Sequence, residues 1–323
     1  MPFPLRAIAV LAVMLSTLPA DAVAEAYPDK PVRMIVSYAP GNVTDVVARL
    51  IGRKLSEMWK QQVVIENRPG AGGSLGADLV AKSPADGYTL LFTAVAPMAI
   101  NPHIYSTVRY NPLTDFTPVA LVALAPLFIV VHPSVPASNL RELIDYTKAH
   151  PGKLNWATPG NGTFSHFALS YLKLNAGLEA EHIPSKASTT VITDLIAGRV
   201  EIGCEAWTVV VPHIKSGAVR ALAVTSPQRS DMMASVPTVA ESVPGWEAAA
   251  WLGIMAPSGV AAEIVRKINA DVLLALNSAE VREALQSNGL QSLPGSPAEF
   301  ATRLRNDFER YALLVKRTGL KIE

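Results

Sequence analysis

The chain has 323 residues, of which 50% are hydrophobic, and its formal net charge is +1. A chain of this length and composition can bury a large core, and its near-neutral charge gives no general attraction for nucleic acid. The single cysteine, Cys204, excludes an internal disulfide bond. We therefore expect a globular protein that binds no nucleic acid.

The first 26 residues have the composition of a secretory signal peptide. Arg6 is their only basic residue, residues 7–15 form an apolar run, and small residues lead up to Ala26. A membrane anchor is the alternative, but the run is shorter than the roughly 20 residues that span a bilayer, and Pro19 ends it. We predict that residues 1–26 are a signal peptide, cut after Ala24 or Ala26, and that the exported chain is not embedded in a membrane.

The first part of the mature chain alternates short apolar runs with helical patterns. Strand-like runs at 32–36 and 62–66 precede helical patterns at 45–59 and from Ser74, and a third strand-like run covers 88–92. Such alternation is typical of an α/β fold with parallel strands.

A second α/β unit is expected from residue 127 onward. An apolar run at 127–133 precedes a helix for which Ser138 is the predicted N-cap. Further strands are expected near Leu154, Ile183, Glu201 and Leu222.

The C-terminal part is predicted to contain a strand at 246–256 and then three consecutive helices. Ser296 and Glu299 form a candidate capping box at the start of the last helix. No linker, repeat or low-complexity segment separates the two halves of the chain.

A glycine-rich turn follows the second predicted strand. Gly70, Gly72 and Gly73 can adopt backbone angles closed to other residues, and they leave backbone N–H groups uncovered. The helix that starts behind them directs its positive end toward this turn. The segment is therefore predicted to bind an anion.

This segment is one of several that resemble a known family. The sequences ENRPGAGG (66–73) and PADGYTLL (84–91) resemble the Bug-type periplasmic receptors of tripartite tricarboxylate transporters. Further similar segments, in the family's order and spacing, are YAPGNVTDVVAR (38–49), NPHIY (101–105), HPSVPASNLREL (132–143), GNGTFSH (160–166), VRALAVTSPQRS (219–230) and VPTVAES (236–242). Together they cover nearly the whole mature chain.

The resemblance implies an α/β periplasmic binding protein of type II, in which two crossover strands join two lobes that close on a ligand. It places residues 27–126 and 248–323 in lobe 1 and residues 127–247 in lobe 2. It implies a periplasmic receptor that delivers a small organic carboxylate, an aromatic or dicarboxylic acid among them, to an integral membrane permease. We expect no bond to be made or broken, no cofactor, and a monomer.

The loop at 40–45 is the first candidate binding segment. It follows the first strand, where the open end of a parallel sheet receives ligands, and it comprises Pro40, Gly41, Asn42, Val43, Thr44 and Asp45. The alternative is that Thr44 is only a helix N-cap and Asp45 only an acid in the first turn. The family usually has a second glycine where Asn42 stands, so the resemblance leaves the path of this loop open.

The segment at 93–102 is expected to be a loop, and the resemblance assigns it to the wall of the cleft. Thr93 is a candidate hydroxyl donor, while Val95 and Ala96 stand where relatives often carry small polar residues. The apolar residues either tune specificity or only pack.

A second anion cradle is predicted just before another helix. It consists of Asn161, Gly162, Thr163, Phe164, Ser165 and His166, and two opposed cradles suit a dicarboxylate. We expect His166 to pack or to cap the helix rather than to act as a base.

Three more residues complete the predicted site. Lys186 can pair with a ligand carboxylate, although a solvated lysine is the commoner case, and Ser188 and Thr189 are candidate caps for the next helix. Glu205 and Trp207 are expected near the edge of the cleft. Trp207 either holds an aromatic ligand together with Phe164 or packs beneath the cleft.

Two other functions are compatible with the sequence. A secreted serine hydrolase is one, with Ser74 or Ser165 as nucleophile, but the G-G-S-L-G match around Ser74 lacks the surrounding motifs of a nucleophile elbow. A carboxylate-sensing module for a signalling partner is the other. No H-E-x-x-H pair or Cys/His cluster appears, so no metal site is predicted.

Overall fold

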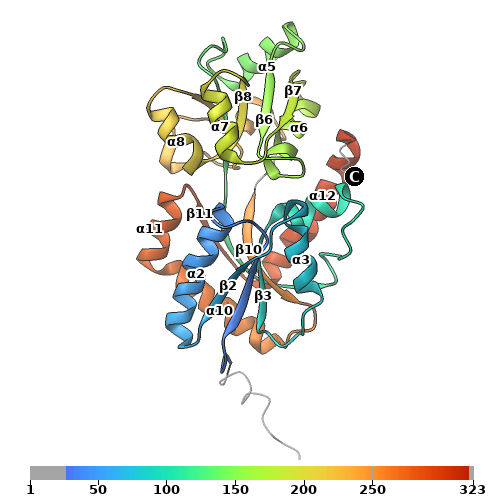
Figure 1. Ribbon diagram of the computed structural model, residues 1–323, viewed down its shortest axis with the longest axis vertical. Coiled ribbons are helices and arrows are strands. Elements are labelled where there is room, and N and C mark those ends of the chain that lie inside the picture. Colours follow the sequence, from blue (N-terminus) through green and yellow to red (C-terminus); the bar gives the residue numbers. More distant parts are fainter. Residues whose placement is uncertain (1–26, 247, 249, 320–323) are drawn as a thin grey trace, which may run out of the picture.

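The computed structural model describes residues 27–246, 248 and 250–319, and the predicted signal peptide lies outside them. The described chain forms two α/β lobes, one above the other in Figure 1. Lobe 1 is used below for the part around the six-stranded sheet, and lobe 2 for the part around the five-stranded sheet.

The sheet of lobe 1 has the strand order β11-β4-β10-β3-β1-β2. Strand β1 pairs in parallel with β2 and β3, whereas β10 runs antiparallel between β3 and β4. The bounds are β1 (Val32–Val36), β2 (Val63–Asn67), β3 (Thr89–Ala94), β4 (Phe116–Leu124), β10 (Trp251–Pro257) and β11 (Gln291–Gly295).

Helices cover both faces of this sheet (Figure 1). On one side lie α2 (Val43–Trp59), α10 (Ala262–Asn277) and α11 (Ala279–Ser287), and on the other lie α3 (Ser74–Ala81) and α12 (Pro297–Thr318). Short segments η1 (Ala71–Gly73), η2 (Ala96–Ile100) and α4 (Asn101–Ile104) complete the lobe. Because both faces are covered, all six residues of β3 are buried, as is usual for a central strand of such a sheet.

The sheet of lobe 2 has the order β7-β6-β8-β5-β9. Its strands are β5 (Leu127–Val131), β6 (Asn155–Thr158), β7 (Glu181–Pro184), β8 (Ile202–Ala206) and β9 (Arg220–Val224). Its helices are α5 (Leu140–Ala149), α6 (Phe164–Ala176), α7 (Ser188–Ile196), α8 (Trp207–Lys215) and α9 (Val239–Ser242), with the 3₁₀ turn η3 (Asp231–Met233).

Two crossover segments join the lobes. Strand β4 of lobe 1 leads through Ala125 and Pro126 directly into β5 of lobe 2, and the chain returns just before β10. The two segments are bonded to each other, since the backbone N–H of Ala125 donates to the carbonyl of Ala250 at 2.8 Å. The two-lobe α/β architecture expected from the sequence is therefore present.

Two predicted helix caps are wrong, and so is the N-cap role given to Thr44 as an alternative. Asn42, not Thr44, is the N-cap of α2, and Asn139, not Ser138, is the N-cap of α5. In each helix the asparagine Oδ1 accepts a backbone N–H, from Thr44 at 2.9 Å and from Glu142 at 3.0 Å. The third error is at α7, which begins after Ala187, so that Ser188 and Thr189 lie inside the helix.

The capping box of α12 is confirmed. The backbone N–H of Glu299 donates to Ser296 Oγ at 3.2 Å, and the backbone N–H of Ser296 donates to Glu299 Oε2 at 2.7 Å. Here the motif spacing alone defines the helix start, because both bonds form within one turn.

The expectation of a loop at 93–102 is also wrong. After β3 the chain forms the π-helical turn η2 and then α4. All five side chains of η2 are buried, and the turn packs against α12. The two prolines in this segment give it a low intrinsic preference for helix. Burial of its apolar side chains against the distant helix α12 compensates for this low preference, and the segment becomes helical.

Candidate functional site between the lobes

The carboxyl ends of the parallel strands in each sheet face the other lobe. Two contacts across the interface demonstrate this arrangement. The hydroxyl of Tyr105 in lobe 1 donates to the carbonyl of Asn161 in lobe 2 at 3.3 Å, and a Cβ built on Gly289 of lobe 1 would overlap Trp207 of lobe 2. Loops at this edge of an open α/β sheet are where ligands bind, so the interface between the lobes is the candidate site.

The loop at 40–45 is held by the buried carboxylate of Asp45. Its Oδ2 accepts from the backbone N–H of Gly41 at 2.9 Å and from Arg49 Nε at 3.1 Å, and its Oδ1 accepts from Asn67 Nδ2 at 2.8 Å. Burial opposes ionisation of Asp45, but these three bonds outweigh it and lower the pKa of its carboxyl. Asp45 thus turns back onto its own loop and fixes it.

The rest of this loop remains accessible. Pro40, Gly41 and Asn42 are exposed, Val43 is half-buried and Thr44 is buried. The exposed backbone is therefore the part of the loop that can meet a ligand.

Replacing Asp45 by asparagine should loosen this loop. An amide cannot accept from three donors as the carboxylate does, so we expect a loss of about 1–3 kcal/mol in the free energy of unfolding and weaker ligand binding. The folded-state pKa of Asp45 is lowered, so its contribution to stability is present above the ordinary value of 3.8 and is lost as the pH falls through the lowered value.

Denaturant unfolding of both proteins at neutral and at acid pH measures this difference. Asp194→Asn is the matched control, because Asp194 also pairs with one arginine, Arg199, at 2.9 Å, but holds no loop between the lobes. Equal losses in the two variants would contradict the role given to Asp45.

The glycine-rich turn beside α3 is supported from below by Asn101. Its Nδ2 donates to the carbonyl of Gly72 at 2.9 Å and to Ser74 Oγ at 3.2 Å. Gly72 and Gly73 both have positive φ, +61° and +98°, and a Cβ on Gly73 would lie 2.6 Å from Pro97 Cγ. Asn101 was missed by sequence reasoning because only the tertiary structure brings it beneath the turn.

Ser74 does not have the environment of an exposed nucleophile. Its side chain is buried, and its hydroxyl accepts the Asn101 amide. The geometry thus gives the hydrolase alternative no support at Ser74.

The three predicted wall residues of lobe 1 are buried. Thr93 Oγ1 accepts from Ser37 Oγ at 3.0 Å, and Val95 and Ala96 lie in the core.

The cradle of lobe 2 surrounds the start of α6. Thr163 caps the helix by accepting the backbone N–H of His166 at 3.3 Å, and the backbone N–H of Gly162 donates to His166 Nδ1 at 3.3 Å. Asn161 is exposed at the tip of this loop, whereas Phe164 and Ser165 are buried, with Phe164 against Phe167.

His166 belongs to a stack of three rings. It lies 4.2 Å from His182, which lies 4.2 Å from Trp156. Burial lowers the pKa of His166 to about 4, and burial together with His166 lowers that of His182 to about 4. Both imidazoles are therefore neutral at pH 7, and His166 packs and supports the loop instead of offering a positive charge.

The remaining predicted residues surround the ends of β7 and β8. Lys186 is exposed on the loop before α7, while Glu205 and Trp207 are buried. The indole of Trp207 packs on Phe128 with ring centroids 5.5 Å apart. Gly289, which contacts Trp207 from lobe 1, is a second residue that sequence reasoning missed.

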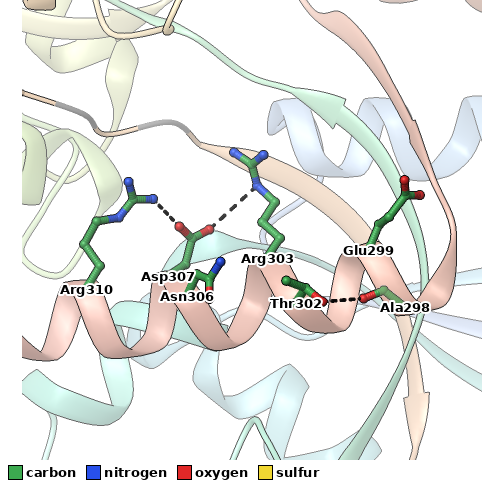
Figure 2. Close-up of a pocket in the computed structure, with 7 residues that line it drawn as sticks. All are labelled: Ala298, Glu299, Thr302, Arg303, Asn306, Asp307 and Arg310. Carbon is green, nitrogen blue, oxygen red and sulfur yellow. Dashed lines mark hydrogen bonds and ion pairs between the residues drawn. The ribbon is translucent and has the colours of Figure 1, made fainter.

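A hollow of about 620 Å³ on α12 is a different feature (Figure 2). Its lining is Ala298, Glu299, Thr302, Arg303, Asn306, Asp307 and Arg310. Asp307 forms ion pairs with Arg303 and Arg310 and accepts from Trp251 Nε1 at 2.8 Å. Since Trp251 begins β10, this cluster anchors α12 to the end of a crossover segment.

Neither a metal centre nor a membrane span is found in the described part of the chain. No group of three His, Cys, Asp or Glu side chains among the described residues is placed to hold a metal ion. Over the same residues, no helix combines the length and the hydropathy needed to cross a bilayer.

Comparison with known proteins identifies the family. Residues 47–320 match the model of the tripartite tricarboxylate transporter family receptor. The chain belongs to this family. It is 36% identical to protein BugT of Bordetella pertussis over 98% of this chain and 99% of that one, so the predicted Bug-type resemblance is confirmed.

Solved structures of similar proteins confirm the receptor fold. R. palustris Rpa4515 with adipate has a TM-score of 0.82 and 34% identity, and covers 91% of this chain and 99% of its own. MatC from Rhodopseudomonas palustris, with bound malate, has a TM-score of 0.79 and 30% identity, over 90% of this chain and 100% of its own. The family is one of solute receptors and not of enzymes.

Proposed function

We propose that this protein is a periplasmic receptor that binds a small organic carboxylate between its lobes and delivers it to the membrane permease of a tripartite tricarboxylate transporter. The observation that carries the proposal is the pair of loops at helix starts on facing sheet edges, 70–73 before α3 and 160–163 before α6. Backbone N–H groups at helix starts favour carboxylates. Two such loops on opposite lobes suit a ligand with a carboxylate at each end.

The known relatives support the same ligand class. Adipate and malate, found in two similar structures, are both dicarboxylates. An aromatic acid remains the second prediction for this chain, and it requires the rings of Phe164 and Trp207 to turn from Phe167 and Phe128 toward the ligand.

A panel of carboxylates tests the proposed function. The mature chain should be stabilised by one class among aliphatic dicarboxylates, tricarboxylates, aromatic acids and amino acids, measured as a rise in its thermal unfolding midpoint. Ligand at about 100 times its dissociation constant adds roughly 2.7 kcal/mol to the free energy of unfolding. A response to aromatic acids alone supports the roles predicted for Phe164 and Trp207, and no response across the panel would contradict carboxylate binding.

Delivery to a permease needs a separate experiment. Uptake of the identified ligand into vesicles that contain the permease should require this receptor. Ligand binding without any stimulation of uptake would favour the sensing alternative.

A further inference from the structure

Glu205 is a buried acid at the edge of lobe 2 that faces lobe 1. It is the next-to-last residue of β8, and two residues later Trp207 contacts Gly289 of lobe 1. The side chain is 1% exposed, and its Oε1 has no hydrogen-bond partner among the described residues. A buried carboxyl oxygen without a partner is costly, so Glu205 is a candidate for contact with a ligand.

The carboxyl lies on the face of the sheet that α7 and α8 cover. Glu205 pairs with Phe128 of β5, and paired residues project from the same face of a sheet. Gly203, two residues earlier on β8, faces Leu195 and Val191 of α7. The Glu205 side chain is therefore beneath the starts of α7 and α8.

Both of these helices begin without a side-chain cap. Their N-cap residues are Ala187 and Ala206, neither of which has a hydrogen-bonding side chain. By contrast, α6 at the same sheet edge is capped by Thr163. The first N–H groups of α7 and α8 are thus left for another acceptor, and a ligand carboxylate suits them.

An ionised Glu205 would repel a carboxylate bound at this position, whereas a neutral Glu205 would donate a hydrogen bond to it. Burial raises the pKa of Glu205 to about 7, although the Ser188 hydroxyl and the Ala206 backbone act in the opposite direction. A substantial fraction of the molecules therefore carries the proton at neutral pH.

The elements packed against Glu205 carry few charged residues. Strands β5 and β6 carry no charged residue, and neither do the first turns of α7 and α8. Cys204 is adjacent to Glu205 on β8, and burial raises the pKa of its thiol, while the exposed Lys186 precedes α7. His182 and the His166 ring stacked on it lie on the opposite face of the sheet, because His182 pairs with Trp156 and Trp156 pairs with Ile202, three residues before Glu205.

We propose that Glu205 binds one carboxylate of the ligand as a neutral acid, together with the first N–H groups of α7 and α8, so that each ligand is bound with one proton. The proton comes from solvent and stays on Glu205, and no bond of the ligand changes. The inference rests on the proposed function. It places the lobe 2 carboxylate of the ligand at the starts of α7 and α8, beside the loop at 160–163, where a Cβ on Gly160 would lie 3.4 Å from the carbonyl oxygen of Ser185.

Calorimetry of the mature chain with adipate and with malate, from about pH 6.5 to 8.5, tests this inference. Above pH 7 the wild-type affinity should fall by up to about tenfold per pH unit, and close to one proton should be taken up for each ligand bound. Glu205→Gln donates a hydrogen bond without titrating, so it should keep the affinity at pH 6.5 and lose the pH dependence. Its thermal unfolding midpoint checks that it folds.

Glu201→Gln is the matched control. Glu201 precedes the same strand at its opposite end and accepts the backbone N–H of Asn155 at 2.7 Å, so this variant should keep the wild-type pH profile. Wild-type binding that is independent of pH would overturn the inference and leave the proposed function intact. If neither adipate nor malate binds at any pH and the carboxylate panel described above gives no stabilisation, the proposed function fails and the inference fails with it.

Discussion

Replacing Gly289 by alanine should force the lobes apart at its contact with Trp207 and should weaken ligand binding by about tenfold or more. Gly289 has a φ of +72°, and a Cβ at this position would overlap the Cβ and Cγ of Trp207 and lie 2.6 Å from Cδ1. The Cβ of Trp207 is fixed by the backbone, so it cannot move aside as the far end of a flexible side chain can. The lobes must therefore separate at this contact. The closure on ligand that the family resemblance implies would then lose its tighter-binding conformation.

A matched variant separates this clash from backbone strain. Gly217 has a φ of +75° and open space around its Cβ position. Gly217→Ala should therefore lose the same free energy of unfolding to backbone strain, of order 1–2 kcal/mol, but it creates no clash between the lobes. Calorimetry gives the affinities, and small-angle scattering with and without ligand reports closure. Binding and closure by Gly289→Ala at the wild-type level would show that this contact is not needed.

Replacing Gly162 by alanine should have a similar effect through the other contact. Gly162 has a φ of +72°, and its Cβ would lie 2.9 Å from Tyr105 Cε2 and 3.0 Å from Cζ. The tyrosine hydroxyl donates to the carbonyl of Asn161, so the ring cannot move without losing that bond. We expect about a tenfold loss of affinity, part of it from disturbance of the predicted cradle at 160–163.

A second substitution tests whether the tyrosine ring is the cause. Tyr105→Ala removes the ring, so the double variant with Gly162→Ala should bind more tightly than Gly162→Ala alone, a positive coupling between the sites. Tyr105→Phe keeps the ring and removes one hydrogen bond. It should make the free energy of ligand binding less favourable by only about 0.5–1.5 kcal/mol. If the double variant binds ligand no more tightly than Gly162→Ala, the whole loss of affinity comes from the backbone at Gly162.

The two contacts come from different parts of lobe 1. Tyr105 follows α4, and Gly289 lies between α11 and β11. A third contact joins α6 to α12, where the rings of Phe167 and Tyr311 pack edge to face at 4.8 Å. Because the contacts are spread over the interface, each single substitution should leave the folding of both lobes intact and act on their association.

Local sequence patterns predicted much of the fold correctly. The alternation of apolar runs and helical patterns gave the parallel strands β1, β2 and β3, and the Ser296 and Glu299 spacing gave the start of α12. The motifs from 38–49 to 236–242 indicated the receptor family that the comparisons confirm. These features depend on residues close together in the chain, so they can be read without the fold.

Caps and loops were predicted less well, because several residue types suit the same position. Thr44 and Ser138 are good N-cap residues, yet Asn42 and Asn139 take those places, since the path of the chain into each helix decides which side chain reaches the free N–H groups. The segment expected to be a loop instead ends β3 and then becomes helical from Ala96, where it packs against α12.

The sequence by itself determined the class of fold, the family and the glycine-rich turn, because periodicity and backbone freedom are local properties. Only the tertiary structure decided that Asn101 supports that turn, that Gly289 meets Trp207, and that Glu205 is buried under two uncapped helices. Each of these depends on segments far apart in the chain that meet when sheets, helices and lobes pack. Steric fit and burial are properties of that packing, and no single segment encodes them.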